Sequence, residues 1–277
     1  MTEGASFIPG SVCWIDVSTT DPAGSRDFYA GLFGWTYEID PDPGRGHYTR
    51  ANLYGRRVAG LAGVPVEPGQ PVIWRLYLTS ANIVHTAEVF DQGGGRLLYG
   101  PADFPGQGSM LVGADPTGAT IGFWQPEAPW TFHTNDAGSL IWAELHTRDG
   151  ALADEFYASL FGYHQEQIGD GVNDDYTTWS RGEQTILGRM QRGADWSPDV
   201  PARWMLYFAV DPRTGTDAAV NRVLELGGQV NIYPYDNELG RIAQVQDPCG
   251  ASFALIDPTA RLESPPRLAA IEDPFDD

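Results

Sequence analysis

The sequence predicts an α+β fold built from four βαβββ units, arranged as two tandem copies of one pair. The first observation is a long repeat: "WIDVSTTDPAGSRDFYAGLFGW", beginning at Trp14, recurs 128 residues later as "WAELHTRDGALADEFYASLFGY", beginning at Trp142. The second is that "DPTGATIGFW", from Asp115, matches "DPCGASFALI", from Asp247, at an offset of 132. Because the offset grows only from 128 to 132, the second half is a tandem copy with short loop insertions.

The elements of the first unit follow from local signals. "SVCWIDVS" alternates between two faces, as a strand does. Asp21 followed by Pro22 is a typical helix start, and Gly34 ends the helix after an apolar face that includes Phe28 and Tyr29. Three strand-like runs then lie near residues 36–39, 48–53 and 57–62.

The same pattern begins again within the first copy. A strand, "VIWRLYLT", precedes a helix over residues 81–92, a glycine stop at 93–95 and three strands that end in "ATIGFWQ". We therefore predict a first domain at 8–126, a linker at 127–138, a second domain at 139–258 and an acidic, Pro-rich tail at 259–277.

Composition excludes several classes of partner. The formal net charge of −20 argues against nucleic acid and anionic membranes, which need a basic surface. Two cysteines are too few for a disulfide framework, and there is neither a signal-peptide pattern nor an apolar run of 18 residues. We predict a cytoplasmic protein. A tandem chain already supplies two copies of the fold, which favours a monomer, and a homodimer is the alternative.

Paired βαβββ units with "FY-x-x-LFGW" and "DP-x-G" resemble the vicinal oxygen chelate superfamily, which includes glyoxalases, extradiol dioxygenases and bleomycin-binding proteins. The resemblance covers residues 11–258 and implies two glyoxalase-like domains with cupped mixed sheets. The tandem form with a tryptophan in each first strand is similar to a branch often labelled glyoxalase-like or hydroxylase. Whether each cleft forms within one copy or between copies is left open.

The resemblance implies where a metal would bind, because ligands in metal-using members come from the first and fourth strands of each unit. The corresponding positions are Trp14, Gly60, Trp74 and Gly122 in the first copy and Trp142, Gly188, Trp204 and Ala254 in the second. None of these side chains ligates a divalent metal. We therefore predict no metal, and the lack of a phosphate or dinucleotide motif predicts no other cofactor.

The tryptophans have two interpretations. Period-two alternation places Trp14, Trp74, Trp142 and Trp204 on the concave face, with Trp124 in the same orientation. Beside the mapped glycines they would form an apolar slot for a planar aromatic ring, and a cationic ring would gain cation–π energy. Tyr48 and Tyr176 lie near strand starts that would rim this cleft. The alternative is that the tryptophans fill the core.

Three polar residues are candidates for acid–base chemistry. Glu144 and His146 are two residues apart on one strand and so share a face, and Asp16 is the equivalent of Glu144 in the first copy. The alternative is that these residues only hydrogen-bond a ligand or a neighbouring strand.

Three functional hypotheses follow, and whether the protein is an enzyme is left open. The first is metal-independent binding of a planar aromatic antibiotic or secondary metabolite, for sequestration or resistance. The second is a metal-independent isomerase, cyclase or hydroxylase of secondary metabolism that uses Glu144 and His146. The third, a metal-dependent glyoxalase or dioxygenase, is opposed by the mapped positions.

Overall fold

The computed structural model describes residues 8–42, 46–65, 72–127, 129–169, 171, 175–193, 196–197 and 199–261. It confirms the α+β fold of four βαβββ units. The predicted tail lies outside the described residues from position 262 onward. No helix among the described residues is long and apolar enough to cross a membrane.

The first copy contains two successive units. Its elements are β1 (Val12–Thr19), α1 (Pro22–Phe33), β2 (Thr36–Ile39), β3 (Thr49–Leu53), β4 (Arg56–Gly63), β5 (Trp74–Thr79), α2 (Ile83–Gln92), β6 (Arg96–Phe104), β7 (Gly108–Ala114) and β8 (Thr120–Pro126). The Asp21 carboxylate accepts a hydrogen bond from the Gly24 N–H, and Gly34 ends α1 in the left-handed conformation at φ 73°.

The second copy repeats this order. Its elements are β9 (Leu140–Thr147), α3 (Gly150–Phe161), β10 (His164–Gln167), β11 (Tyr176–Arg181), β12 (Gln184–Gln191), β13 (Arg203–Ala209), α4 (Gly215–Glu225), β14 (Gln229–Asn237), β15 (Gly240–Gln246) and β16 (Ser252–Asp257). The helix signals recur too, since Asp149 caps α3 and Gly162 ends it at φ 67°.

Each copy forms its own eight-stranded mixed sheet, which answers the question that the sequence left open. The strand order is β2-β3-β4-β1-β5-β8-β7-β6 in the first copy and β10-β11-β12-β9-β13-β16-β15-β14 in the second. The two units of a copy meet where β1 runs antiparallel to β5, and β9 to β13. The face over β1 and β5 and the face over β9 and β13 are therefore each formed by the strands of a single copy.

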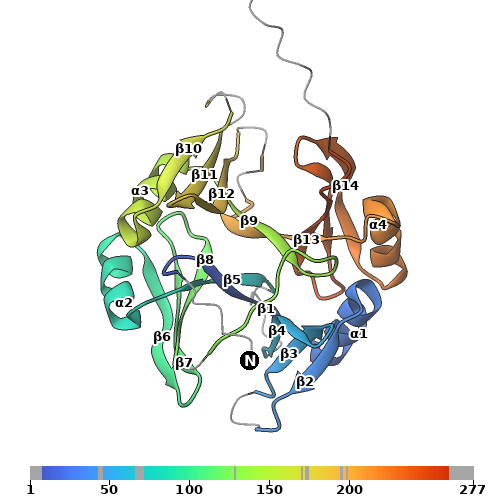
Figure 1. The fold of residues 1–277 in the computed structure, drawn as a ribbon, viewed down its shortest axis with the longest axis horizontal. Coiled ribbons are helices and arrows are strands. Elements are labelled where there is room, and N and C mark those ends of the chain that lie inside the picture. The colour runs from blue at the N-terminus through green and yellow to red at the C-terminus, as the bar shows by residue number, and fades with distance from the viewer. Residues whose placement is uncertain are drawn as a thin grey trace, which may run out of the picture.

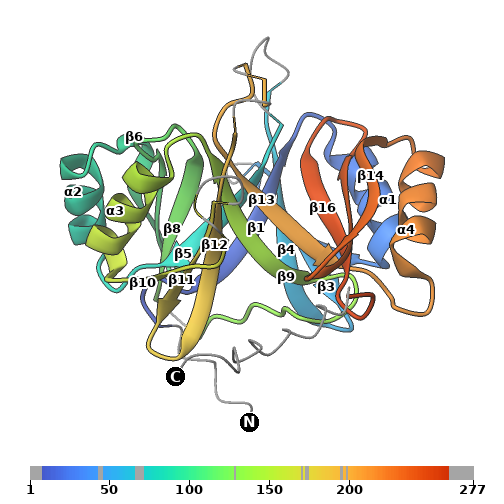
Figure 2. The same ribbon diagram turned by 90° about the horizontal axis from the view of Figure 1, so that it is seen from above.

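The two sheets pack through their helix-covered faces. α2 lies beside α3 at one side of the molecule and α1 beside α4 at the other (Figures 1 and 2). The large apolar core lies between the sheets and draws residues from both copies, for example Phe33 against Phe208 and Phe90 against Phe156. The opposite face of each sheet is left to build a site.

Candidate functional site

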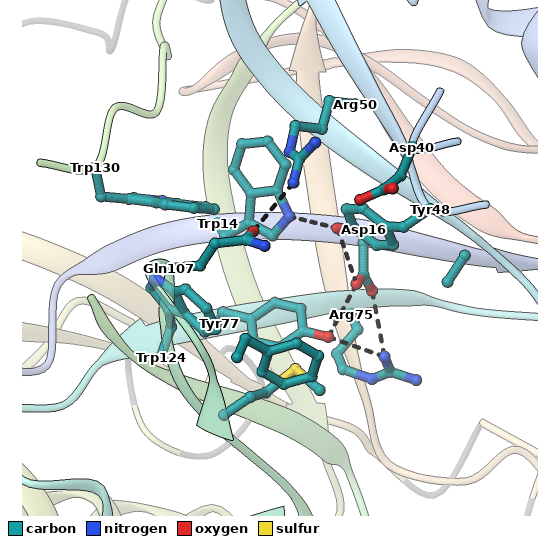
Figure 3. A pocket seen from close by; sticks show the side chains of 13 residues that line it. Trp14, Asp16, Asp40, Tyr48, Arg50, Arg75, Tyr77, Gln107, Trp124 and Trp130 are labelled. Atoms are coloured by element: carbon teal, nitrogen blue, oxygen red, sulfur yellow. Dashed lines mark hydrogen bonds and ion pairs between the residues drawn. The ribbon is translucent and has the colours of Figure 1, made fainter. Parts of the chain in front are cut away.

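A cavity of about 260 Å³ lies on the outer, concave face of the first sheet (Figure 3). Its walls are largely aromatic: Trp14 from β1, Trp124 from β8 and Trp130 from the segment that follows β8. The ring centroids of Trp124 and Trp130 are 5.1 Å apart, and those of Trp14 and Trp130 are 5.3 Å apart. Phe104 and Met110 extend the apolar lining.

The polar side of the cavity is organised around the Asp16 carboxylate. Asp16 Oδ2 accepts hydrogen bonds from the Tyr77 hydroxyl at 2.9 Å and the Tyr48 hydroxyl at 3.3 Å, while Arg75 approaches Oδ1 at 3.3 Å. Trp14 Nε1 donates to the Tyr48 hydroxyl at 2.7 Å, which joins the aromatic wall to this cluster. All five side chains line the cavity (Figure 3).

Burial sets the protonation chemistry of this cluster. It raises the pKa of Asp16 above its ordinary value of 3.8, although the charge of Arg75 and the hydrogen bonds of Tyr77 and Tyr48 lower it in part. The Arg75 side chain is 18% exposed, so the ion pair lies at the boundary between core and cavity. The Asp16 carboxyl group therefore lies between the hydroxyls of Tyr48 and Tyr77 and the positive charge of Arg75.

Two polar side chains close the rim of the cavity. Arg50 on β3 donates to Gln107 Oε1 at 3.0 Å, and Gln107 lies in the turn between β6 and β7 (Figure 3). This hydrogen bond spans the two units of the copy. Asp40, just after β2, lines the same rim.

Both mapped glycines of the first copy are covered by tyrosines. A Cβ on Gly60 would meet the Tyr48 hydroxyl at 1.8 Å, and a Cβ on Gly122 would meet the Tyr77 ring at 2.2 Å. The predicted slot beside the glycines is therefore wrong in detail, because Tyr48 and Tyr77 fill that space. The cavity lies farther out, between the indoles.

The prediction that Trp74 and Trp204 face the cleft is also wrong. Trp74 lies in the main core and donates from Nε1 to the Tyr29 hydroxyl of α1 at 3.0 Å, and Trp204 packs edge-on against Tyr157 of α3. In the antiparallel register of β1 and β5, Tyr77 lies opposite Trp14. Directly paired residues share a face, so Tyr77 faces the cavity and Trp74 does not.

The second copy keeps part of the arrangement. Trp142 Nε1 donates to the Tyr176 hydroxyl at 2.9 Å, as Trp14 does to Tyr48. Glu144 Oε1 accepts from the Tyr207 hydroxyl and lies 2.7 Å from His146 Nε2. Burial alone would raise the pKa of Glu144, but the hydrogen bond and charge of His146 lower it below its ordinary value of 4.5. The two predicted catalytic residues do meet.

Glu144 and His146 are nevertheless inaccessible where they stand. Their side chains are each 1% exposed, and neither lines the aromatic cavity of the first copy. Met205 lies opposite Glu144, whereas Arg75 lies opposite Asp16. An apolar cluster fills the second concave face, made of Met205, Tyr207, Ile242, Ala254 and Ile256, with Ile141 and Trp142 packed against it.

Sequence reasoning missed several residues of the cavity. Arg75 and Tyr77 were missed because the sequence prediction placed Trp74, and not its neighbours on the opposite face of the strand, in the cleft. Trp130 lies in the segment predicted to be a linker, yet its Nε1 donates to the Cys13 carbonyl at 2.9 Å and its ring closes the aromatic wall. The sequence signal was "PW" at residues 129–130 of the predicted linker, an aromatic residue that no predicted helix or strand orients.

The side chains of the cavity do not fit a divalent metal. Asp16 is the carboxylate at its centre, and the guanidinium of Arg75 already occupies the position from which a cation would be attracted. No group of three or more histidine, cysteine, aspartate or glutamate side chains that could hold a metal occurs among the described residues. The donor set thus differs from a three-ligand metal site.

Comparison with known proteins gives both sequence relatives and structural neighbours, although no family model matches the chain. "Putative glyoxylase CFP32" of Mycobacterium tuberculosis is 34% identical over 263 residues, which cover 93% of this chain and 98% of that protein. "Anthracycline biosynthesis protein DnrV" of Streptomyces peucetius is 34% identical over 266 residues, covering 91% and 94%.

Two solved structures show the same fold at low identity. The Mn(II)-bound glyoxalase of Novosphingobium aromaticivorans superposes with a TM-score of 0.60 at 12% identity, covering 92% of this chain and 86% of its own. The 2,2',3-trihydroxybiphenyl 1,2-dioxygenase of Sphingomonas wittichii RW1 gives 0.61 at 14% identity, covering 90% and 91%. With its paired βαβββ units and full-length relatives, the chain belongs to the vicinal oxygen chelate superfamily of glyoxalase-like proteins.

Proposed function

We propose that the cavity of the first copy binds a planar, oxygenated aromatic small molecule without the help of a metal. The observation that carries this proposal is the meeting of three indoles, Trp14, Trp124 and Trp130, around one cavity. Aromatic pairs contribute about 0.5–1.5 kcal/mol beyond the area they bury. A volume of about 260 Å³ lies just below the usual range of small-molecule sites, about 300–1,000 Å³, which suits a small, flat ligand.

The polar side of the cavity supports a ligand that carries oxygen. Arg75 donates from Nη1 to Asp16 and Tyr77 and from Nη2 to Ser18, which leaves further N–H groups on a guanidinium that lines the cavity. A carbonyl or phenolic oxygen on the ring system would accept from such a donor or from a tyrosine hydroxyl. The cavity thus favours quinones and phenols over plain hydrocarbons.

The names of the relatives agree with this chemistry. The protein from Streptomyces peucetius is named for anthracycline biosynthesis, and an anthracycline contains a planar, oxygenated ring system. This supports a role in secondary metabolism, in which the protein sequesters such a compound.

A second candidate function is acid–base tailoring of the bound compound by Asp16. Its raised pKa, caused by burial, favours a carboxyl that exchanges a proton with a ligand at the cavity wall. This moves the chemistry that the sequence assigned to Glu144 and His146 into the first copy, where the carboxyl lines a cavity.

One titration separates these functions. The full chain is titrated with hydroxylated naphthoquinones and anthraquinones, with tryptophan fluorescence as the signal and mass spectrometry of the recovered compound. Saturable quenching with unchanged ligand supports sequestration, whereas a new product that disappears in Asp16→Asn supports tailoring. An absence of saturable quenching by every aromatic compound tested would contradict both.

A further inference from the structure

We infer that the second copy carries a separate binding site for an oxyanion, a carboxylate or phosphate group, built around the guanidinium of Arg203. Arg203 is the first residue of β13 and lies opposite His146 of β9 in the sheet register. It shares the concave face with Met205 and Tyr207, so the site lies on that face, at the start of β13 and beside the apolar cluster. This site is distinct from the aromatic cavity of the first copy.

The first argument is that Arg203 has no partner among the described residues. It forms neither a hydrogen bond nor an ion pair there, and its Nε is buried without an acceptor. Burial lowers its pKa, with a smaller opposing effect from Tyr207. A partly buried guanidinium without an acceptor costs free energy, and a bound anion would remove that cost.

The second argument is that two more arginines add positive charge at the same place. Arg192 is 4% exposed. Burial, together with the charges of Arg203 and Arg148, lowers its pKa to about 10. Its terminal nitrogens donate to three carbonyls, those of His146, Val200 and Pro201, which fixes the loop between β12 and β13 to the end of β9.

The third argument is the contrast between the buried Arg192 and the equally buried Arg189. Within the described ranges, Arg148, Arg192 and Arg203 form no ion pair, although the chain has a formal net charge of −20. Arg148 donates instead to the Trp196 carbonyl at 2.7 Å. By comparison, Arg189 pairs with Asp154 and Asp175, and Arg241 pairs with Asp217 and Asp236. Arg192 and Arg203 are thus a buried and a half-buried guanidinium without a carboxylate partner, and the exposed Arg148 adds to their charge, so an external anion would be attracted here.

The residues around Arg203 favour an oxyanion over a cationic or neutral ligand. Glu144 is already bonded to His146 and Tyr207, so its charge is not available to Arg203. His146 Nδ1 is buried without a partner. Trp196 lies between the groups, with Arg192 5.1 Å from its ring and His146 at its edge at 5.9 Å. The planar fork of a guanidinium matches the two oxygens of a carboxylate or phosphate.

The repeat shows that this arrangement belongs to the second copy alone. At the offsets of the repeat, the positions of Arg148, Arg192 and Arg203 are occupied in the first copy by Thr20, Val64 and Ile73. In the first copy an arginine, Arg75, lies opposite the central carboxylate; in the second copy that position is Met205, and the arginine lies two residues earlier. The two concave faces therefore differ in where they present an arginine to a ligand.

The test uses inorganic phosphate and acetate in separate arms, at an ionic strength held constant with sodium chloride. Isothermal titration should show saturable binding of at least one of them, and the unfolding temperature should rise with its concentration. Arg203→Gln should weaken that binding at least tenfold. Arg213→Gln should leave it unchanged, because Arg213 is exposed and already paired with Asp211. Stronger binding of phosphate or of acetate identifies the group that the natural ligand carries.

Arg203→Gln also removes a positive charge that repels Arg192. In chloride buffer it should therefore unfold at the same or a higher temperature than the wild type, and the anion that binds the wild type should reverse that order. If it does not fold, Arg148→Gln provides the second variant, because Arg148 is exposed, and it should weaken binding at least threefold. Equal binding by the wild type and these variants, or no saturable binding of either probe, would overturn the proposal.

Discussion

The Tyr29 hydroxyl of the first copy donates a hydrogen bond to Asp247 Oδ2 of the second copy at 2.9 Å. The reciprocal bond joins Tyr157 to Asp115 Oδ2, also at 2.9 Å. Each bond connects the "FY" of one copy to the "DP-x-G" turn of the other. The motifs that mark the fold in the sequence therefore supply two of the polar contacts that join the copies.

Removing either hydroxyl should destabilise the protein. Tyr29→Phe and Tyr157→Phe each leave a buried carboxylate without one donor, and Tyr29→Phe also leaves Trp74 Nε1 without its acceptor, so each should lower the free energy of unfolding by about 1–3 kcal/mol. Urea unfolding at neutral pH measures this. Tyr54→Phe is the control, because that side chain is 82% exposed and should change stability by less than about 0.5 kcal/mol. Equal effects at all three positions would contradict the assignment.

Gly60→Ala should damage the aromatic cavity, and Gly188→Ala should not. The new methyl group at position 60 would displace the Tyr48 hydroxyl, which accepts from Trp14 and donates to Asp16. Gly188 stands in the same relation to Tyr176 of the second copy. We expect quinone affinity, measured by fluorescence titration, to fall at least tenfold in Gly60→Ala alone. Similar losses in both variants would indicate a general effect on folding.

Arg75→Met introduces at position 75 the residue that the second copy has at the equivalent position, Met205. It leaves the Asp16 carboxylate buried without its positive partner, which should cost about 3–5 kcal/mol of stability. The added change Asp16→Asn removes the uncompensated charge and should restore at least half of the loss. Denaturant unfolding of both single variants and the double variant measures the coupling. Additive losses would show that the two side chains do not interact.

The acid stability of the protein should depend on Glu144. Its pKa is lower in the folded state than the ordinary value of 4.5, so the unfolded chain binds the proton more readily. The stabilisation is therefore complete at neutral pH and is lost as pH falls from about 4.5 through the lower folded-state pKa. Glu144→Gln should flatten the unfolding free energy between about pH 5 and pH 3. The exposed Glu166→Gln is the control and should keep the wild-type profile.

The fold could be predicted because its helices and strands are specified by local sequence signals, and the repeat shows the same signals twice. Asp21 and Gly34 cap α1, and Asp149 and Gly162 cap α3, as their residue types indicate. The pairing of Glu144 with His146 was also predictable, since residues two apart on a strand share a face.

The site was harder to predict because it depends on contacts between distant segments. Trp74 was placed on the wrong face, since only the register of β1 against β5 shows that Tyr77 shares the face of Trp14. Trp130 carries no periodicity because it lies in an irregular segment. The two concave faces differ at equivalent positions of the repeat, such as Trp124 in the first copy and Ile256 in the second. The effect of such a difference on cavity volume appears only when the sheet is assembled.

The most direct test of the central claim is the dissociation constant of one hydroxylated anthraquinone for Trp130→Ala and for Trp196→Ala. Trp130 lines the cavity of the first copy, whereas Trp196 packs against His146 of the second. The account predicts that Trp130→Ala weakens binding at least tenfold and that Trp196→Ala changes it less than twofold. A loss confined to Trp196→Ala would place the ligand in the second copy and contradict the account.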